Sequence, residues 1–453
     1  MAKGAMDIHE LEALRRENAY LRTQLDQLKT SHSACNEHQP VSSHSTSGQA
    51  PHELTRWDIA RYSRQLLVPE IGVAGQRALK QASVLVVGAG GLGAPNILYL
   101  AAAGVGRIGI VDHDVVERSN LQRQVIHDES RIGLSKAASA KSSVDKLNSS
   151  IECIAYEYLL DSSNAMDIIS KHDIVIDASD NAATRYLIND ACVLLNKTLV
   201  SASALRMDGQ LSVYHHPIST STSDPISPTD YSPCYRCIFP TPPPPSTVLN
   251  CSDGGVLGVV TGIIGCIQAL EAIKIIAGMG SSYAGKLLIL DAATLSFRVV
   301  GLRKRKSGCL VCGDEPVIKE LVDYVAFCGA GPHDKATTQR VLSPKDRITS
   351  RELLDIRASL QPHVLLDVRE KIEFDICSLP DSIHVPLKEL ETRLPELSKV
   401  LNKAPSIYVL CKRGNDSQLA TRLLLNKGFM NVKDVTGGLV SWANDVDPQF
   451  PLY

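Results

Sequence analysis

The stretch SVLVVGAGGLGAPN, residues 83–96, decides the fold of the first part of the chain. Its apolar run, residues 83–87, has the length and composition of a buried strand, and glycines follow at positions 88, 90 and 93. Glycines at this spacing let the backbone approach a phosphate group while the N-terminus of the next helix points at it. The stretch therefore predicts a nucleotide-binding unit of strand, loop and helix.

Outward from this unit, short apolar runs alternate with helical segments. RIGIV (107–111) and DIVID (173–177) are two further predicted strands. The alternation predicts an α/β fold, a Rossmann-like domain with a mixed, mostly parallel sheet over residues 57–314. Buried-strand patterns return in HVLLDVRE and SIYVLC, which predict a second, smaller α/β domain over residues 346–453.

The segments outside these domains are polar or weakly patterned. Leucines at alternating spacings of three and four in residues 1–30 predict a short N-terminal helix, either a brief coiled coil or a lone surface helix. The Ser- and His-rich residues 31–56 are interpreted as a flexible linker, and residues 315–345 as a second linker.

Composition indicates a protein of the cytoplasm (cytosol). The N-terminus shows no secretory signal, so the 12 cysteines point to a reducing compartment, where metal and catalytic roles outrank disulfides. A net charge of −2 argues against a general nucleic-acid coat, and no direct nucleic-acid partner is expected. The uncharged stretch 254–270 is interrupted by glycines and predicts a buried helix, with no membrane partner.

Polar residues after the predicted strands indicate which nucleotide is bound. On the glycine motif alone a nicotinamide dehydrogenase is the leading interpretation, with Asp112 on a ribose hydroxyl. Arg123 and Lys136 favour a triphosphate instead, and a carboxylate at Asp180 can hold Mg²⁺ against phosphate oxygens. The sequence therefore predicts an ATP–Mg²⁺ site at the carboxyl ends of the strands, with further polar groups at Ser119, Asn120, Gln122 and Asn181.

Two CxxC pairs predict a metal site. PCYRC supplies Cys234 and Cys237, and GCLVC supplies Cys309 and Cys312. Four thiolates at this spacing fit a closed, tetrahedral Zn²⁺ site, which leaves no open position for a substrate. The expected role is structural, with one Zn²⁺ per subunit.

The segments RYSRQLLVPEIGVAGQ, GAGGLGAP, SNLQRQ, DASDNAATRYLIND and TLVSASALRMDGQ resemble the MoeB/ThiF branch of the ubiquitin-activating-type enzymes. The resemblance implies adenylation of the C-terminal glycine of a ubiquitin-like sulfur carrier that ends in Gly-Gly. It implies ATP contacts at Gly91, Asp112, Ser119, Asn120, Leu121, Gln122, Arg123, Lys136, Asp180 and Asn181. It also implies a homodimer in which Arg64 reaches the ATP site of the other subunit.

A loop cysteine, Cys251 in VLNCSDGGVLG, takes its role from the same resemblance. In this family a cysteine at this position forms a thioester or a related adduct with the activated carrier. Cys251 is therefore expected to hold the carrier as a thioester or to act as a resolving thiol that cuts an acyl-persulfide.

The C-terminal domain has its own candidate nucleophile. Cys411 ends a predicted strand and begins the loop CKRGND before a helix, an arrangement that aims backbone N–H groups at the sulfur and is expected to lower its pKa. A cysteine phosphatase would need arginine at position 417, where this chain has Ser417. The domain instead resembles a rhodanese domain, which implies a persulfide on Cys411.

An adenylating domain followed by a rhodanese domain resembles the eukaryotic molybdopterin synthase sulfurylases, which also activate the ubiquitin-related modifier. The resemblance implies that a cysteine desulfurase loads Cys411 and that the carrier leaves as a thiocarboxylate. The thiocarboxylate would serve molybdenum cofactor biosynthesis and the 2-thiolation of wobble uridine in tRNA. The alternative is an activator of ubiquitin-like conjugation with an inactive rhodanese domain.

Overall fold

The computed structural model describes residues 54–218, 231–244, 254–329 and 341–453. The predicted N-terminal helix, most of the first predicted linker and Cys251 lie outside these residues. Two bodies are described below, each by itself: residues 54–329 and residues 341–453.

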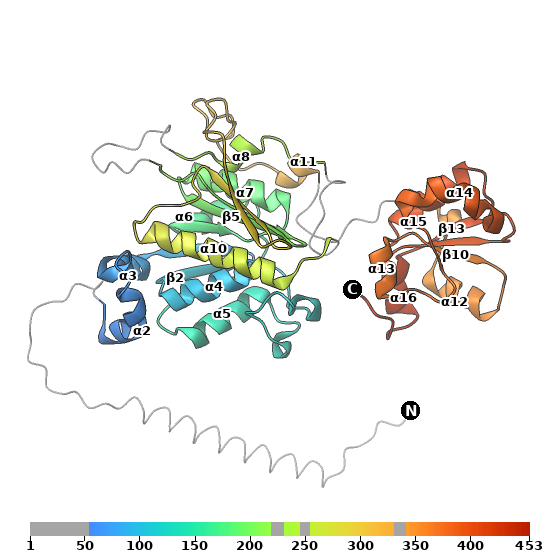
Figure 1. The fold of residues 1–453 in the computed structure, drawn as a ribbon, viewed down its shortest axis with the longest axis horizontal. Helices are drawn as coiled ribbons and strands as arrows, with labels where there is room; N and C mark the ends of the chain where they lie inside the picture. Colours follow the sequence, from blue (N-terminus) through green and yellow to red (C-terminus); the bar gives the residue numbers. More distant parts are fainter. Residues whose placement is uncertain (1–53, 219–230, 245–253, 330–340) are drawn as a thin grey trace, which may run out of the picture. The chain divides into compact units, whose positions relative to one another are not determined.

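The first body is built on a sheet of eight strands (Figure 1). Their order is β3-β2-β1-β4-β5-β6-β7-β8; β3 to β5 run parallel, and β6, β7 and β8 are each antiparallel to the preceding strand. The bounds are β1 (Ser83–Val87), β2 (Arg107–Val111), β3 (Glu152–Tyr156), β4 (Ile174–Asp177), β5 (Thr198–Leu205), β6 (Asp208–Tyr214), β7 (Lys286–Asp291) and β8 (Ser296–Gly301). The predicted mixed, mostly parallel α/β fold is confirmed.

Helices cover both faces of this sheet. Side chains of β1 alternate between two cores: Val84 and Val86 pack with one set of helices, Leu85 and Val87 with the other. The first set is α4 (Gly93–Ala103), α5 (Lys136–Leu147) and α10 (Gly258–Ile276), and the second is α6 (Ala165–Ser170), α7 (Ala182–Leu194) and α11 (Tyr324–Cys328). The remaining elements are α2 (Arg56–Leu66), α3 (Gly72–Gln81), η1 (Arg118–Asn120), η2 (Glu129–Arg131) and α8 (Tyr235–Ile238).

Helix α10 corresponds to the uncharged stretch of the sequence. Its length and composition would suit a membrane span, but one face packs against α4 and β5 in the core of the first body (Figure 1). The buried residues Thr261, Gly265 and Gln268 lie on this face. Burial of Glu271 is balanced by Lys274, whose Nζ lies 2.6 Å from the carboxylate. The expectation of a buried core helix is met on this face.

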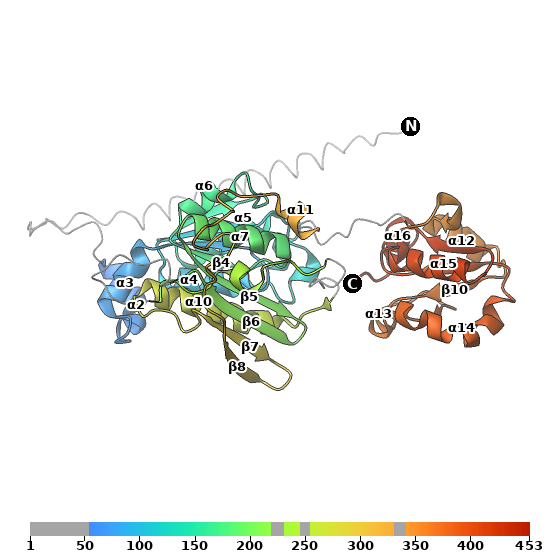
Figure 2. The ribbon, with the colours of Figure 1, turned by 90° about the horizontal axis from the view of Figure 1, so that it is seen from above.

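The second body has a sheet of five parallel strands in the order β11-β10-β12-β13-β9. The strands are β9 (Arg347–Ile348), β10 (Val364–Asp367), β11 (Ile383–His384), β12 (Ile407–Leu410) and β13 (Val432–Val435). Its helices are η5 (Pro344–Asp346), α12 (Ser350–Ala358), α13 (Lys371–Ile376), α14 (Leu387–Leu401), α15 (Asp416–Asn426) and α16 (Gly438–Asp445), and Figure 2 shows them on both sides of the sheet. A reciprocal capping box between Thr349 and Glu352 starts α12.

Candidate active sites and metal centre

The glycine loop lies where the strand order of the first sheet reverses. β1 has β2 on one side and β4 on the other, so the connection from β1 to β2 and the connection from β4 to β5 run in opposite directions. Open α/β sheets bind ligands beyond the strand ends at such a point. Gly88 has φ +100°, a conformation that side chains disfavour. A Cβ on Gly93 would lie 1.8 Å from the carbonyl oxygen of Gly88, so only glycine allows α4 to begin this close to the loop.

The peptide groups of Ala89 are held from two sides. Its N–H donates to Asp112 Oδ2 at 2.8 Å, and its carbonyl oxygen lies 3.2 Å from His127 Nε2. The other ring nitrogen, Nδ1, lies 2.8 Å from Ser139 Oγ on α5. Burial raises the pKa of the Asp112 carboxyl against the opposing effect of Lys136, and burial lowers the pKa of His127 to about 4. His127 is therefore neutral at pH 7 and fixes the loop through its Nε2–H donor.

The segment 119–123 forms a turn beside the loop. Asn120 is buried and exchanges capping hydrogen bonds with Glu117, and Arg123 Nη1 donates to the carbonyl of Ser119 at 3.0 Å. The N-terminus of α10 packs on this turn so closely that a Cβ on Gly258 would lie 2.3 Å from Gln122 O. The turn is thereby set by both η1 and α10.

The predicted charged groups come from two further strand ends. Lys136 begins α5, is buried, and its Nζ lies 2.9 Å from Asp114 Oδ2, just beyond Asp112. Asp180 follows β4 and is exposed. Asn181 caps α7, since its side chain accepts the N–H of Thr184 at 2.9 Å. The glycine loop, Asp112 and Asp180 therefore follow β1, β2 and β4 at the carboxyl edge of the parallel strands, where sheets of this kind bind ligands, and Lys136 joins them through its ion pair with Asp114.

Arg64 lies elsewhere in the first body. It is exposed on α2, which is anchored at the far ends of two helices: Gln65 Nε2 donates to Ala103 O at 3.1 Å at the end of α4, and Asn148 Nδ2 donates to Tyr62 Oη at 2.9 Å beyond α5. The 11 residues of α4 span about 16 Å. The helix α2 therefore packs at the opposite ends of α4 and α5 from the glycine loop of its own chain.

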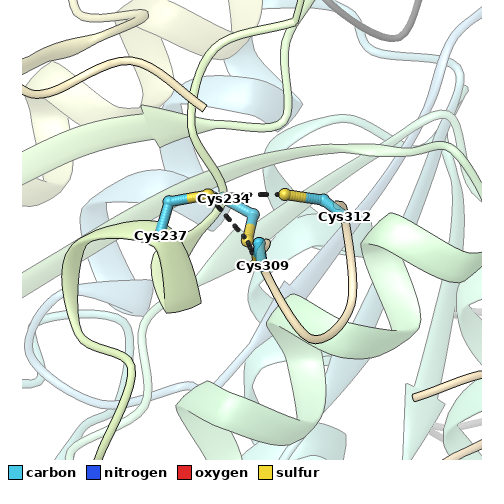
Figure 3. A group of neighbouring side chains, drawn as sticks. All are labelled: Cys234, Cys237, Cys309 and Cys312. Atoms are coloured by element: carbon cyan, nitrogen blue, oxygen red, sulfur yellow. Dashed lines mark hydrogen bonds between the residues drawn. The ribbon is translucent and has the colours of Figure 1, made fainter. Parts of the chain in front are cut away.

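The four cysteines of the CxxC pairs converge (Figure 3). Their Sγ atoms all lie within 4.8 Å of one another, with separations of 3.8 Å for Cys234–Cys237, 3.6 Å for Cys234–Cys309 and 3.4 Å for Cys237–Cys312. Sulfur atoms around a tetrahedral Zn²⁺ are about 3.8 Å apart for Zn–S bonds of about 2.3 Å. All four thiols are buried, so the donor set fits a thiolate-bound metal ion.

In the second body Cys411 lies just after β12 and is 2% exposed. The N–H of Gly414 points at its Sγ at 3.1 Å, as expected for a loop that cradles an anion. Gly438, the first residue of α16, allows this helix to pack closely on Cys411, because a Cβ on Gly438 would lie 2.2 Å from Cys411 O. Asp367 and Arg369 form a buried ion pair on the neighbouring strand end and carry no reacting group.

The expected direction of the Cys411 pKa was wrong. Burial raises the pKa of the thiol, and the contacts with Ser417 and with the Gly414 N–H, which lower it, do not offset that effect. The nearby carboxylate of Asp416 raises it further. The sequence indicated the donors of the loop but could not indicate that the sulfur lies in the core of the domain.

The sequence also missed residues that touch these sites. His127 and Ser139 support the glycine loop, and Ser417 links Cys411 to Asp434 on β13. Ser417 was noted only for the arginine that a phosphatase would have there. Ser417 and Asp434 are 17 residues apart and lie in different elements, so no local sequence pattern pointed to this pair.

Comparison with known proteins agrees with this division into two bodies. The chain matches the ThiF family over residues 62–311 and the rhodanese-like domain over residues 349–445. It is 50% identical over 419 residues to the adenylyltransferase and sulfurtransferase MOCS3 of Mus musculus, covering 88% of each chain. It is 47% identical over 456 residues to the protein of the same name from Danio rerio, covering 97% of this chain and 96% of that one. The chain thus belongs to the ThiF family, with a rhodanese-like domain after it, and is a bifunctional adenylyltransferase and sulfurtransferase.

Proposed function

We propose that the chain activates the C-terminal glycine of ubiquitin-like sulfur carriers and then converts that carboxylate into a thiocarboxylate. The carriers end in Gly-Gly and comprise the small subunit of molybdopterin synthase and the ubiquitin-related modifier. One observation carries the proposal: a single chain holds a glycine loop bordered by cations and, in another domain, a buried thiol cradled by backbone N–H. The thiocarboxylates would supply molybdenum cofactor biosynthesis and the 2-thiolation of wobble uridine in tRNA, in the cytosol.

Adenylation makes the carboxylate electrophilic. The glycine carboxylate attacks the α-phosphorus of ATP, the bond between that phosphorus and the oxygen bridging to the β-phosphate breaks, and pyrophosphate leaves as the acyl-adenylate forms. Lys136 and Arg123 lie where they can balance the negative charge that develops, and exposed Asp180 at the end of β4 is suited to hold Mg²⁺. Gly91 leaves room beside Thr261, where a Cβ would lie 2.7 Å from the hydroxyl oxygen. Asp112, Ser119, Asn120, Leu121, Gln122 and Asn181 complete the proposed ATP contacts.

A homodimer supplies the remaining cation. The position of α2, at the ends of α4 and α5 away from the glycine loop, supports a role for Arg64 in the site of a second subunit. Exposed apolar side chains lie on the contiguous helices α2, α3, α4 and α10, and covering them would favour self-association. They are Trp57, Val73, Tyr99, Val259 and Leu270, with Leu67 directly after α2.

Sulfur reaches the acyl group through thiols. A cysteine desulfurase loads Cys411 with a persulfide, whose terminal sulfur attacks the acyl-adenylate and displaces AMP. The product is an acyl-persulfide, carrier–CO–S–S–Cys411. The thiolate of Cys251 then attacks the Cys411 sulfur, which releases the thiocarboxylate and leaves a Cys251–Cys411 disulfide for an external thiol to reduce. Alternatively, Cys251 first holds the carrier as a thioester, which the persulfide then attacks.

The metal centre has a structural task in this scheme. A closed Cys₄ site bound to Zn²⁺ ties α8 to the loop that contains Cys309 and Cys312. No step of the reaction is assigned to it, and one Zn²⁺ per subunit is expected.

The separation of the two chemical steps provides the test. With purified full-length chain, exchange of pyrophosphate into ATP should require a carrier ending in Gly-Gly and should survive Cys411→Ala. Formation of the thiocarboxylate, followed by the gain in mass when sulfur replaces oxygen at the carrier terminus, should be lost in that variant. A carrier lacking its last glycine is the control, and exchange that proceeds equally well with it would contradict the proposal.

The alternative function is activation of the carrier for ubiquitin-like conjugation, by a chain whose own rhodanese domain is inactive. The Gly414 N–H that points at Cys411 favours an active domain. Incubation with thiosulfate and mass spectrometry of the intact chain separate the two, because an inactive domain would acquire no persulfide at Cys411.

A further inference from the structure

A continuous chain of buried hydrogen bonds leads away from Cys411. Its Sγ lies 3.3 Å from Ser417 Oγ in the first turn of α15, and Ser417 Oγ lies 2.5 Å from Asp434 Oδ1 on β13. Ser417 and Asp434 are both fully buried. A serine hydroxyl has one proton, and a carboxylate can only accept it. Since Ser417 donates to Asp434, the contact between Cys411 and Ser417 is satisfied when the thiol donates its own proton to Ser417.

At the far end of this series of hydrogen bonds, Asp434 is paired with the guanidinium group of Arg347. Arg347 on β9 donates from Nε to Asp434 Oδ2 at 2.7 Å, which leaves Oδ1 for Ser417. In the sheet Asp434 pairs with Arg347 on β9 and, on its other side, with Val409 of β12, two residues before Cys411, whereas Ser417 comes from the first turn of α15. A purely structural serine needs only one acceptor, whereas this one also faces the reacting sulfur.

We propose that Ser417 and Asp434 form a proton relay that deprotonates Cys411 when its persulfide is loaded. This inference rests on the proposed role of Cys411 as the persulfide carrier. As the Cys411 sulfur attacks the outer sulfur of the donor, its proton passes to Ser417 Oγ while the Ser417 proton passes to Asp434 Oδ1. With thiosulfate, the thiol, S₂O₃²⁻ and the Asp434 carboxylate give the Cys411 persulfide anion, SO₃²⁻ and a protonated Asp434. The S–S bond of thiosulfate breaks, a new S–S bond forms, and charge and atoms balance.

Burial of both end groups of the relay makes assisted proton transfer necessary. Burial raises the pKa of both the Cys411 thiol and the Asp434 carboxyl, so the thiol does not ionise readily and the carboxylate is a better base than an exposed one. The charged groups near the sulfur are Lys412 and Arg413 in the loop, Asp416 at the start of α15, the buried Asp367–Arg369 pair at the end of β10, and Arg347 behind Asp434. Arg347 lowers the pKa of Asp434, but less than burial raises it.

The helix α15 offers a matched pair of substitutions. Ser417→Ala removes the relay, and Thr421→Val removes another buried hydroxyl one turn later whose oxygen has no partner in the described structure. Each variant of the full chain is incubated with thiosulfate, and the rate of persulfide formation at Cys411 is measured against pH. At pH 7 we expect Ser417→Ala to load about 10²-fold more slowly than the unmodified chain, whereas Thr421→Val should match it. The deficit of Ser417→Ala should shrink as pH rises, because hydroxide then removes the thiol proton.

A structural role for Ser417 would give a different pH profile, with a deficit of equal size at every pH, and that result or no deficit would overturn the relay. Asp434→Asn checks the second member, since an amide cannot take the proton, and it should show the same pH-dependent deficit. Alkylation of Cys411 by iodoacetamide, measured against pH, separates this inference from the proposed function. If the unmodified chain acquires no persulfide, the proposed function fails. The relay still requires slower alkylation in Ser417→Ala than in Thr421→Val near pH 7, and equal rates would overturn it.

Discussion

Two strand–loop–helix units carry the chemistry of this chain, and they differ in what the loop contains. The loop between β1 and α4 presents glycine backbone, and its supports, Asp112 and His127, bind peptide groups. The loop between β12 and α15 presents a buried sulfur, and its supports, Gly414 and Ser417, bind that sulfur. The first arrangement keeps space for a substrate that arrives complete, whereas the second keeps the reagent on the protein itself. Substitutions in the first loop should therefore lower pyrophosphate exchange, and substitutions in the second should lower sulfur transfer.

The largest expected effect is a loss of stability that is confined to the first body. Cys309→Ser removes one of four buried sulfur ligands, so the metal content should fall from one ion per chain toward none, with a loss of several kcal/mol of unfolding free energy in the first body. Metal analysis and calorimetry measure the change. Sulfur transfer from thiosulfate to cyanide by the second body should persist, and its loss would show that the two bodies are not independent.

A smaller effect should strike the glycine loop alone. In Gly93→Ala the added methyl group would lie 1.8 Å from Gly88 O, so the loop must move by an ångström or more. We expect carrier-dependent pyrophosphate exchange to fall by at least about 10²-fold, since misplacement on this scale typically has that effect. Gly262→Ala on α10, where a Cβ meets nothing within 4 Å, is the control and should retain exchange. An active Gly93→Ala chain would contradict the requirement for backbone space.

The smallest effect concerns the pH dependence of the loop support. Since the pKa of folded His127 is lowered to about 4 from an ordinary value of about 6.5, its contribution to stability is complete above pH 6.5 and is lost as pH falls toward 4. We expect about 2 kcal/mol of unfolding free energy to disappear over this range, a value reduced for solvent screening. Denaturant titrations of the chain and of His127→Gln, which does not titrate, should diverge by this amount. Parallel curves would contradict it.

Local patterns predicted most of the framework. The runs at 83–87 and 107–111 became strands with those bounds. Each depends on residues adjacent or nearly adjacent in sequence, where apolar periodicity and side-chain reach decide the structure. The four-cysteine cluster was also predictable from the sequence, because each CxxC pair is a short-range spacing and two such pairs together imply one metal site.

The supports of the sites could not be predicted in this way. His127 is 38 residues from its partner Ala89, and Asp434 on β13 contacts Ser417 on α15, so neither pairing leaves a local pattern in the sequence. The pKa of Cys411 was predicted in the wrong direction because a motif names hydrogen-bond donors and says nothing of depth. Burial belongs to the whole domain and became visible only with the fold.

Helix α10 joins two surfaces that would otherwise be independent. Its Thr261 fills the space behind Gly91, while Val259 and Leu270 face outward with more than half of their surface exposed. Because these residues belong to one helix, a displacement of α10 would move Thr261 together with Val259 and Leu270. If a partner bound to the outer residues and changed nucleotide affinity through that displacement, nucleotide would change the affinity for the partner by the same factor.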